Sequence, residues 1–146
     1  MRMDHEEMVA REILKLARKV TRRRNHHLRA VDLTTEQADA LIFFSDQPHS
    51  SVTTFKRAQG ITHQTARLIV QRLDKRGLVT FTPDPGDGRS KLVSVTAAGT
   101  AKRQQLLVHG WQTSATLFTH FSPDQQQTFL TLLKLANENL ESSEEL

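Results

Sequence analysis

The sequence of 146 residues contains no cysteine. Disulfides, thiolate metal ligands and thiol-based redox sensing are therefore excluded. Tyrosine is also absent, and apart from histidine the aromatic side chains amount to one tryptophan and seven phenylalanines. So small an aromatic content argues against a surface that stacks the bases of single-stranded nucleic acids.

Long apolar runs are missing as well. No segment approaches the roughly 18 uninterrupted apolar residues that a membrane span needs. The first residues, MRMDHEEMVAREI, mix charges of both signs and lack the apolar block of a secretory signal. We therefore expect a cytoplasmic protein with no membrane partner.

The sequence also lacks the local motifs of common catalytic sites. It has no glycine-rich phosphate loop, no His-Glu-x-x-His motif and no cysteine nucleophile. Composition does not rule out a serine–histidine–acid site, but no local motif supports one. We expect neither an enzyme nor a bound cofactor.

Histidines are the remaining candidates for metal ligands, and the chain has seven of them. His26 and His27 are adjacent, whereas His109 and His120 stand alone in helical segments. None of these four residues forms an i, i+4 pair of the kind that binds metal on one helix face. We expect no metal site.

Positive charge is present and is concentrated in one segment. The whole chain has a net charge of +4. Between Val52 and Lys91 there are eight lysines and arginines against three aspartates, so that segment alone carries +5. This concentration indicates a polyanionic partner more strongly than the overall balance does.

Apolar periodicity and end signals predict a mainly helical chain. Thr34-Thr35-Glu36-Gln37 is a capping box that opens a helix ending before Pro48. Gly60 and Gly77 stand where the chain needs positive φ to end a helix. We expect helices over residues 5–29, 34–47, 52–59, 63–76, 97–119 and 123–140.

Two β-prone runs, Leu78–Thr82 and Lys91–Val95, interrupt the helical pattern. The segment between them, Pro83–Ser90, holds two prolines, two glycines and two aspartates, all of which favour turns. This pattern predicts a β-hairpin with an extended loop.

The order helix, turn, helix and hairpin is that of a winged helix-turn-helix. The expected fold class is mainly α with a small β-hairpin wing, a winged region over residues 34–95 and flanking helices over 5–29 and 97–140. The helix after Gly60 is narrow enough to enter a DNA major groove, where its first residues would meet base edges. An ordinary capped surface helix is the alternative interpretation.

Groove-reading side chains occur at the start of that helix. Glutamine can bond an adenine edge, arginine a guanine edge, and threonine a base or a phosphate. At the hairpin tip, Arg89 could enter a narrow minor groove, with Asp87 bracing its guanidinium. A local surface ion pair is the alternative there. The candidate DNA contacts are Thr62, His63, Gln64, Thr65, Arg67, Arg72, Asp87, Gly88, Arg89, Ser90 and Lys91.

These residues resemble the MarR family of multiple-antibiotic-resistance-type transcription regulators over positions 31–99. The family's wing signature, Asp-x-Arg-Ser/Ala, falls on Asp87–Ser90. One departure is Phe55-Lys56, where the family usually carries Leu-Ala. The other matching stretches are Leu33-Thr34-x-x-Gln37, Gly60-Ile61-Thr62, Leu73–Val79, Pro83–Asp87 and Val95-Thr96-x-x-Gly99.

The resemblance implies a single domain over residues 1–146 and a homodimer joined by its first and last helices. Two winged regions would then read a pseudo-palindromic duplex, with Arg89 in the minor groove. Most members are repressors released by a small aromatic or anionic ligand, which binds between the dimerisation helices and the winged region. The candidate ligand residues are Arg23, His26, Phe43 and Trp111, although core packing explains Phe43 and Trp111 equally well.

The outer helices carry more apolar positions than a small winged core can bury. A symmetric partner would cover them, and an intrachain helical bundle is the alternative. The positions in question are Leu106, Leu107, Trp111, Phe118, Phe129, Leu132 and Leu133.

Alternative functions remain open beside the ligand-responsive repressor. They are a DNA-binding architectural protein of low sequence specificity, a metal-responsive regulator, and a winged helix that binds a protein instead of DNA.

Overall fold

The computed structural model describes the backbone of residues 2–144 and the side chains of residues 4–143. The chain divides into two compact units, Met1–Gly110 and Trp111–Leu146. No helix in the described residues is long and apolar enough to cross a membrane. The elements are α1 (Arg2–Ala30), α2 (Thr35–Asp46), β1 (Ser50–Ser51), α3 (Val52–Gln59), α4 (His63–Lys75), β2 (Val79–Asp84), β3 (Asp87–Val95), α5 (Ala97–Leu117) and α6 (Pro123–Glu144).

The predicted fold class is confirmed: the chain is mainly helical, and a three-stranded sheet forms the base of a wing. Helix boundaries differ from the predicted ones by a few residues, because terminal turns fray and their ends are weakly marked in sequence. The short strand β1 was not predicted. Two residues carry no periodicity, and β1 exists because it pairs with β3 through Ser50–Val93 and Ser51–Leu92.

The predicted capping box at the start of α2 is confirmed. The Thr34 hydroxyl accepts from the Gln37 backbone N–H at 3.1 Å, and the Gln37 side chain accepts from the Thr34 N–H at 3.3 Å. The same Gln37 oxygen accepts from the Arg76 guanidinium at 2.9 Å. Arg76 therefore ties the end of α4 to the start of α2.

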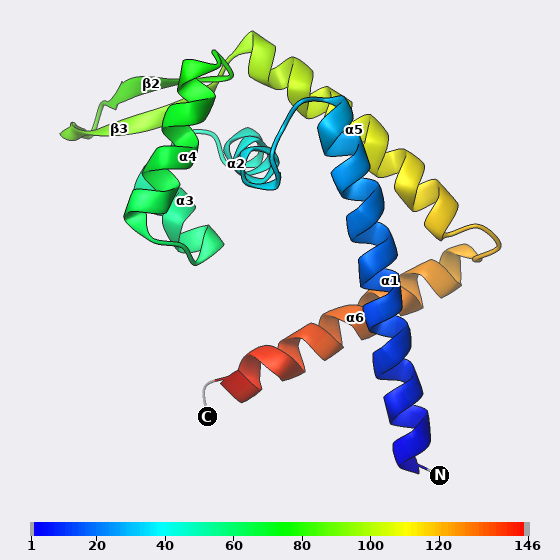
Figure 1. Cartoon of the computed structure of the whole chain (residues 1–146). Helices are drawn as coiled ribbons and strands as arrows, with labels where there is room; N and C mark the ends of the chain where they lie inside the picture. The colour runs from blue at the N-terminus through cyan, green and yellow to red at the C-terminus, as the bar shows by residue number, and fades with distance from the viewer. Residues whose placement is uncertain (1, 145–146) are drawn as a thin grey trace. The chain divides into compact units, whose positions relative to one another are not determined.

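Two glycines end the helices of the helix-turn-helix as predicted. Gly60 follows α3 with φ +64°, and Gly77 follows α4 with φ +73°. This backbone conformation is costly for residues with a Cβ. The two turns set the direction in which α4 leaves α3 and in which β2 leaves α4, as Figure 1 shows.

One buried cluster holds the winged region together. Phe44 of α2 and Phe55 of α3 pack with ring centroids 5.2 Å apart, and both are almost fully buried. Val93 of β3 is also fully buried. Phe55, which stands at a position where leucine is usual in the resembled family, therefore serves the core. The α4 side chains in this core are Ala66, Ile69, Val70 and Leu73.

The hairpin differs from the prediction of an extended loop. Its strands run on to Asp84 and start again at Asp87, so only Pro85 and Gly86 form the turn. The Asp84 carboxylate accepts from the Gly86 N–H at 2.9 Å and stabilises that turn. The pairing shifts register between Pro83 and Asp84. Because Pro83 pairs with Lys91 and Asp84 with Asp87, the strands reach further than predicted, and Gly88, Arg89 and Ser90 have no partner in the ladder.

Helix α5 is anchored on the winged region through its first turns. The Thr96 hydroxyl accepts from the Gly99 N–H at 3.1 Å and donates to the Gly77 carbonyl at 2.6 Å. Lys102 donates to the Val31 carbonyl, just past the end of α1. Leu106, which was predicted to need a partner surface, instead packs against the winged core and is partly buried there.

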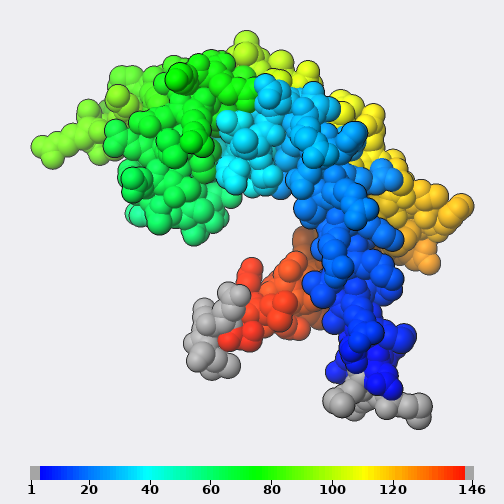
Figure 2. Space-filling view, viewed as in Figure 1, coloured from blue at the N-terminus to red at the C-terminus, as the bar shows by residue number. Residues whose placement is uncertain are grey.

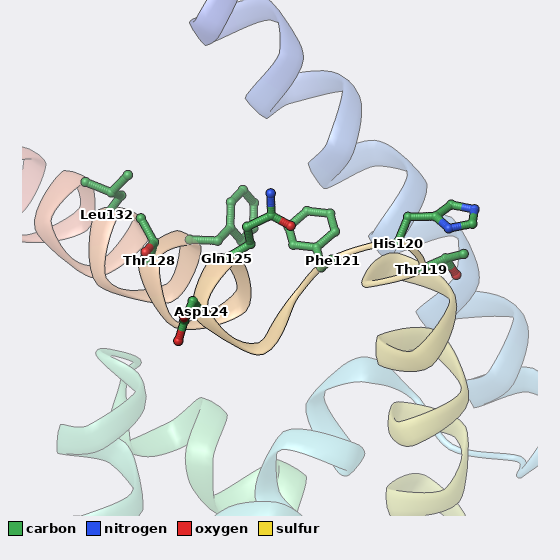
Figure 3. Close-up of a pocket in the computed structure, with 8 residues that line it drawn as sticks. Thr119, His120, Phe121, Asp124, Gln125, Thr128 and Leu132 are labelled. Carbon is green, nitrogen blue, oxygen red and sulfur yellow. The ribbon is translucent and has the colours of Figure 1, made fainter.

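The second unit contains the end of α5 and α6. A capping box opens α6: the Ser122 hydroxyl accepts from the Gln125 N–H, and the Gln125 side chain accepts from the Ser122 N–H. The rings of Phe118, Phe121 and Phe129 pack edge to face. Phe121, Phe129 and Leu132 help to line an open hollow of about 500 Å³ (Figure 3).

Candidate nucleic-acid interface

Helix α4 has one buried face and one exposed polar face. Thr62 caps its start, since the Thr62 hydroxyl accepts from the Thr65 N–H at 3.1 Å. The Thr62 hydroxyl also donates to the Thr65 hydroxyl at 2.8 Å, so Thr65 is partly used within the cap. The exposed residues of the helix are His63, Gln64, Thr65, Arg67, Leu68, Gln71, Arg72, Asp74 and Lys75.

A concave surface of about 420 Å³ lies between α4, the start of α3 and the base of the wing, and we call it the α4–wing groove. Its cations are Arg67, Arg89 and Lys91, and no carboxylate lines it. None of the ion pairs among the described side chains involves these three residues. The full lining is Ser51, Val52, Thr53, His63, Arg67, Gln71, Phe81, Arg89, Ser90 and Lys91.

The tip of the wing is held by its own side chains. The hairpin extends away from the rest of the winged region (Figure 2). The Asp87 carboxylate accepts from the Arg89 backbone N–H at 3.0 Å and from the Ser90 hydroxyl at 3.1 Å. The prediction that Asp87 braces the Arg89 guanidinium is therefore wrong. The short turn places the carboxylate over the backbone, which leaves the guanidinium available to a partner.

The structure brings together five of the predicted contacts in the groove: His63, Arg67, Arg89, Ser90 and Lys91. The other six, Thr62, Gln64, Thr65, Arg72, Asp87 and Gly88, lie outside its lining but on the same two elements or at the helix cap.

Sequence reasoning missed Thr53 and Gln71, which also line the groove. Gln71 could have been found, because it continues the i, i+4 row of His63 and Arg67. The place of Thr53 in the groove could not be predicted from the sequence, because it depends on how α3 packs beside the hairpin.

The predicted ligand residues have separate surroundings and do not line one common pocket among the described ones. The His26 ring lies edge-on to His27, with centroids 5.9 Å apart. Phe43 packs against Phe44 and Phe55, and it also lines an open hollow of about 350 Å³. Trp111 is 64% exposed and belongs to the second unit.

The predicted ligand set omitted a histidine pair that the fold creates. The ring of His27 on α1 stacks on that of His109 on α5, with centroids 4.3 Å apart and planes 14° from parallel. The Nδ1 of His109 is buried without a hydrogen-bond partner in the described structure. Sequence spacing could not reveal a pair made by two helices so far apart in the chain.

We expect this pair to make stability pH-dependent. Partial burial, followed by the nearby His109, His26 and Arg23, lowers the pKa of His27 below its usual 6.5. The His27 imidazole therefore takes up a proton more readily in the unfolded chain than in the folded chain. The free energy of unfolding should therefore fall as pH drops from about 6.5 through the lowered pKa. Thermal denaturation at pH 5.0 to 7.5 measures this.

The matched comparison is His27→Gln against His5→Gln, an exposed histidine on the same helix. The His27 variant should lose part of the pH dependence, and the His5 variant should keep all of it. Equal pH profiles for wild type and His27→Gln would contradict the prediction.

No group of three or more histidine and carboxylate side chains within residues 4–143 is arranged to hold a metal ion.

The helix-turn-helix, the two-stranded wing and the cationic groove define a winged helix-turn-helix protein. Residues 31–90 match the sequence pattern of the MarR family. The chain is 31% identical over 102 residues to the HTH-type transcriptional repressor NicR of Pseudomonas putida, covering 70% of this chain. The aligned region spans 65% of the length of that relative.

Two solved structures have similar folds. The S. aureus MepR–DNA complex has a TM-score of 0.66 and 18% identity, over 86% of this chain and 95% of MepR. The Streptomyces coelicolor regulator PcaV, solved with its natural ligand, has a TM-score of 0.65 and 24% identity, over 84% of this chain and 89% of PcaV. Residues 31–90 therefore form a MarR-family region.

Proposed function

We propose that this protein is a homodimeric regulator of transcription that binds double-stranded DNA of a defined, pseudo-palindromic sequence in the cytoplasm. The observation that carries the proposal is the α4–wing groove, where three cations without an ion-pair partner among the described side chains lie with His63 and Gln71 of α4, and where no carboxylate is part of the lining. Such a surface attracts phosphates while presenting base-reading side chains.

The proposed contacts divide into two groups. His63, Gln64 and Arg67 at the start of α4 meet base edges in the major groove, where the second helix of a helix-turn-helix lies. Arg89 at the wing enters the minor groove, and Lys91 neutralises phosphate. Thr62, Thr65, Arg72, Asp87, Gly88 and Ser90 position these groups or contact the backbone.

The dimer is proposed from the apolar surface of the outer helices. Trp111 on α5 and Leu132 and Leu140 on α6 are more than half exposed. Large apolar side chains left exposed in this number favour an interaction surface, and a second copy of the chain would bury them symmetrically. In the proposed dimer, each chain acts as one domain over residues 1–146 and contributes one DNA-reading arm.

Repression released by a small ligand is the finer part of the proposal. NicR is named as a repressor and PcaV was solved with a ligand, which supports this mode of action for a member of the same family. Arg23 and His26 are suited to an anionic group, and Phe43 and Trp111 to an aromatic one. The ligand would act by its different affinity for DNA-bound and free arrangements of the dimer.

The test is a selection of bound sequences from a random duplex pool, together with the molar mass of the protein in solution. We expect a dimeric mass and a palindromic consensus with half-sites about one DNA turn apart. Similar affinity for every duplex, with steep salt dependence, would instead indicate low-specificity binding. Failure to shift any duplex at low salt would overturn the proposal.

A further inference from the structure

The exposed face of α4 carries a single apolar side chain. Leu68 is 47% exposed, whereas the other apolar residues of this helix are buried in the core. All remaining exposed residues between His63 and Lys75 are polar or charged. Leu68 belongs neither to the buried core nor to the residues packed against it, so its side chain is available to a partner.

The direction of Leu68 follows from helix geometry. The buried face is defined by Ala66, Ile69, Val70 and Leu73. With about 100° between successive residues, Gln64, Leu68 and Gln71 all lie within about 40° of the line opposite that face. Leu68 therefore projects alongside Gln64, one helical turn later, on the surface that would meet base edges.

We propose that Leu68 reads a thymine by packing against its 5-methyl group in the major groove. This inference rests on the proposed function. The thymine methyl is the apolar group that B-DNA displays in the major groove, and apolar side chains recognise it by contact. Any other base would leave Leu68 facing a polar edge or empty space.

The position of the thymine follows from the same geometry. Four residues of helix rise about 6 Å, which corresponds to about two base-pair steps. The thymine therefore lies about two base pairs from the base that Gln64 contacts. Gln64→Ala should relax the consensus at one position, and that position serves as the reference point.

The experiment replaces single thymines of the selected duplex by deoxyuridine, which removes the methyl group and keeps the hydrogen-bonding edge. Affinities are measured for wild type, Leu68→Ala and Leu68→Met by fluorescence anisotropy. Replacement in one half-site should weaken wild-type binding about fourfold, the equivalent of about 0.8 kcal/mol for one buried methyl group, and replacement in both half-sites about 15-fold. Leu68→Ala should be indifferent to that replacement, and Leu68→Met should remain sensitive.

The outcomes separate the inference from the proposed function. The inference is overturned if the protein binds a specific duplex but deoxyuridine weakens wild type and Leu68→Ala equally, or not at all. It is also overturned if the consensus has no thymine near that position. In both cases the proposed function remains intact. Absence of binding to any duplex overturns both. Because Leu68 is exposed, Leu68→Ala should unfold at the wild-type temperature, which is checked in the same samples.

Discussion

Replacing Arg89 by alanine should weaken binding to the selected duplex roughly 100-fold, measured by anisotropy at fixed salt. Each wing of the proposed dimer would lose one arginine contact, and a loss of about 1.4 kcal/mol per wing corresponds to tenfold each. The guanidinium lines the α4–wing groove and has no ion-pair partner among the described side chains. Its removal therefore disturbs little within the folded chain.

Two control variants separate shape from charge. Arg89→Lys keeps the charge but loses the planar fork, so it should restore only part of the affinity. Arg29→Ala removes an equal charge from an exposed position at the end of α1, outside the groove, and should change affinity little. An Arg29 variant as weak as the Arg89 variant would mean that net charge, and not the wing, determines binding.

Replacing Gly99 by alanine should destabilise the fold by about 3 kcal/mol or more, at the upper end of the range for overpacked sites. A Cβ at this position would lie 2.1 Å from the Leu78 carbonyl oxygen and 2.7 Å from Val95 Cγ1. The Leu78 carbonyl accepts a hydrogen bond from the Thr96 N–H at 3.1 Å, so it cannot move without breaking the junction between β2 and α5. Thermal unfolding at fixed protein concentration measures the loss.

The control is Gly110→Ala on the same helix. A Cβ at Gly110 would meet nothing within 4 Å, and alanine favours a helix over glycine by about 0.5–1 kcal/mol. This variant should therefore be as stable as wild type or more so. If the two variants unfolded at the same temperature, the close approach of α5 to Leu78 would not be a determinant of stability.

Local signals in the sequence were sufficient for most of the elements. Thr34 predicted a helix start, and Thr62 and Ser122 cap their helices in the same way, because these hydroxyls accept from N–H groups within the same turn. Gly60 and Gly77 predicted the two turns of the helix-turn-helix for a similarly local reason. Such interactions involve neighbours in the chain, so a short stretch of sequence contains everything needed to predict them.

The wing shows where local reasoning failed. Pro83–Ser90 has the composition of a loop, yet only Pro85 and Gly86 form the turn, and Pro83, Asp84 and Asp87 have partners across the hairpin. Ladder pairing depends on the strand opposite, and composition says nothing about that strand. Asp87 is a different case, because its carboxylate accepts from the Arg89 N–H and the Ser90 hydroxyl, and these local contacts replace the predicted contact with the Arg89 guanidinium.

The basic segment from Val52 to Lys91, the helix-turn-helix pattern and the wing motif were determined by the sequence itself, because each depends on residue types at fixed spacing. Only the tertiary structure decided that Thr53 joins Arg67 and Arg89 in one groove, and that His27 stacks on His109. These contacts join elements far apart in the chain, and they follow from how buried faces pack. Spacing along the sequence does not encode them.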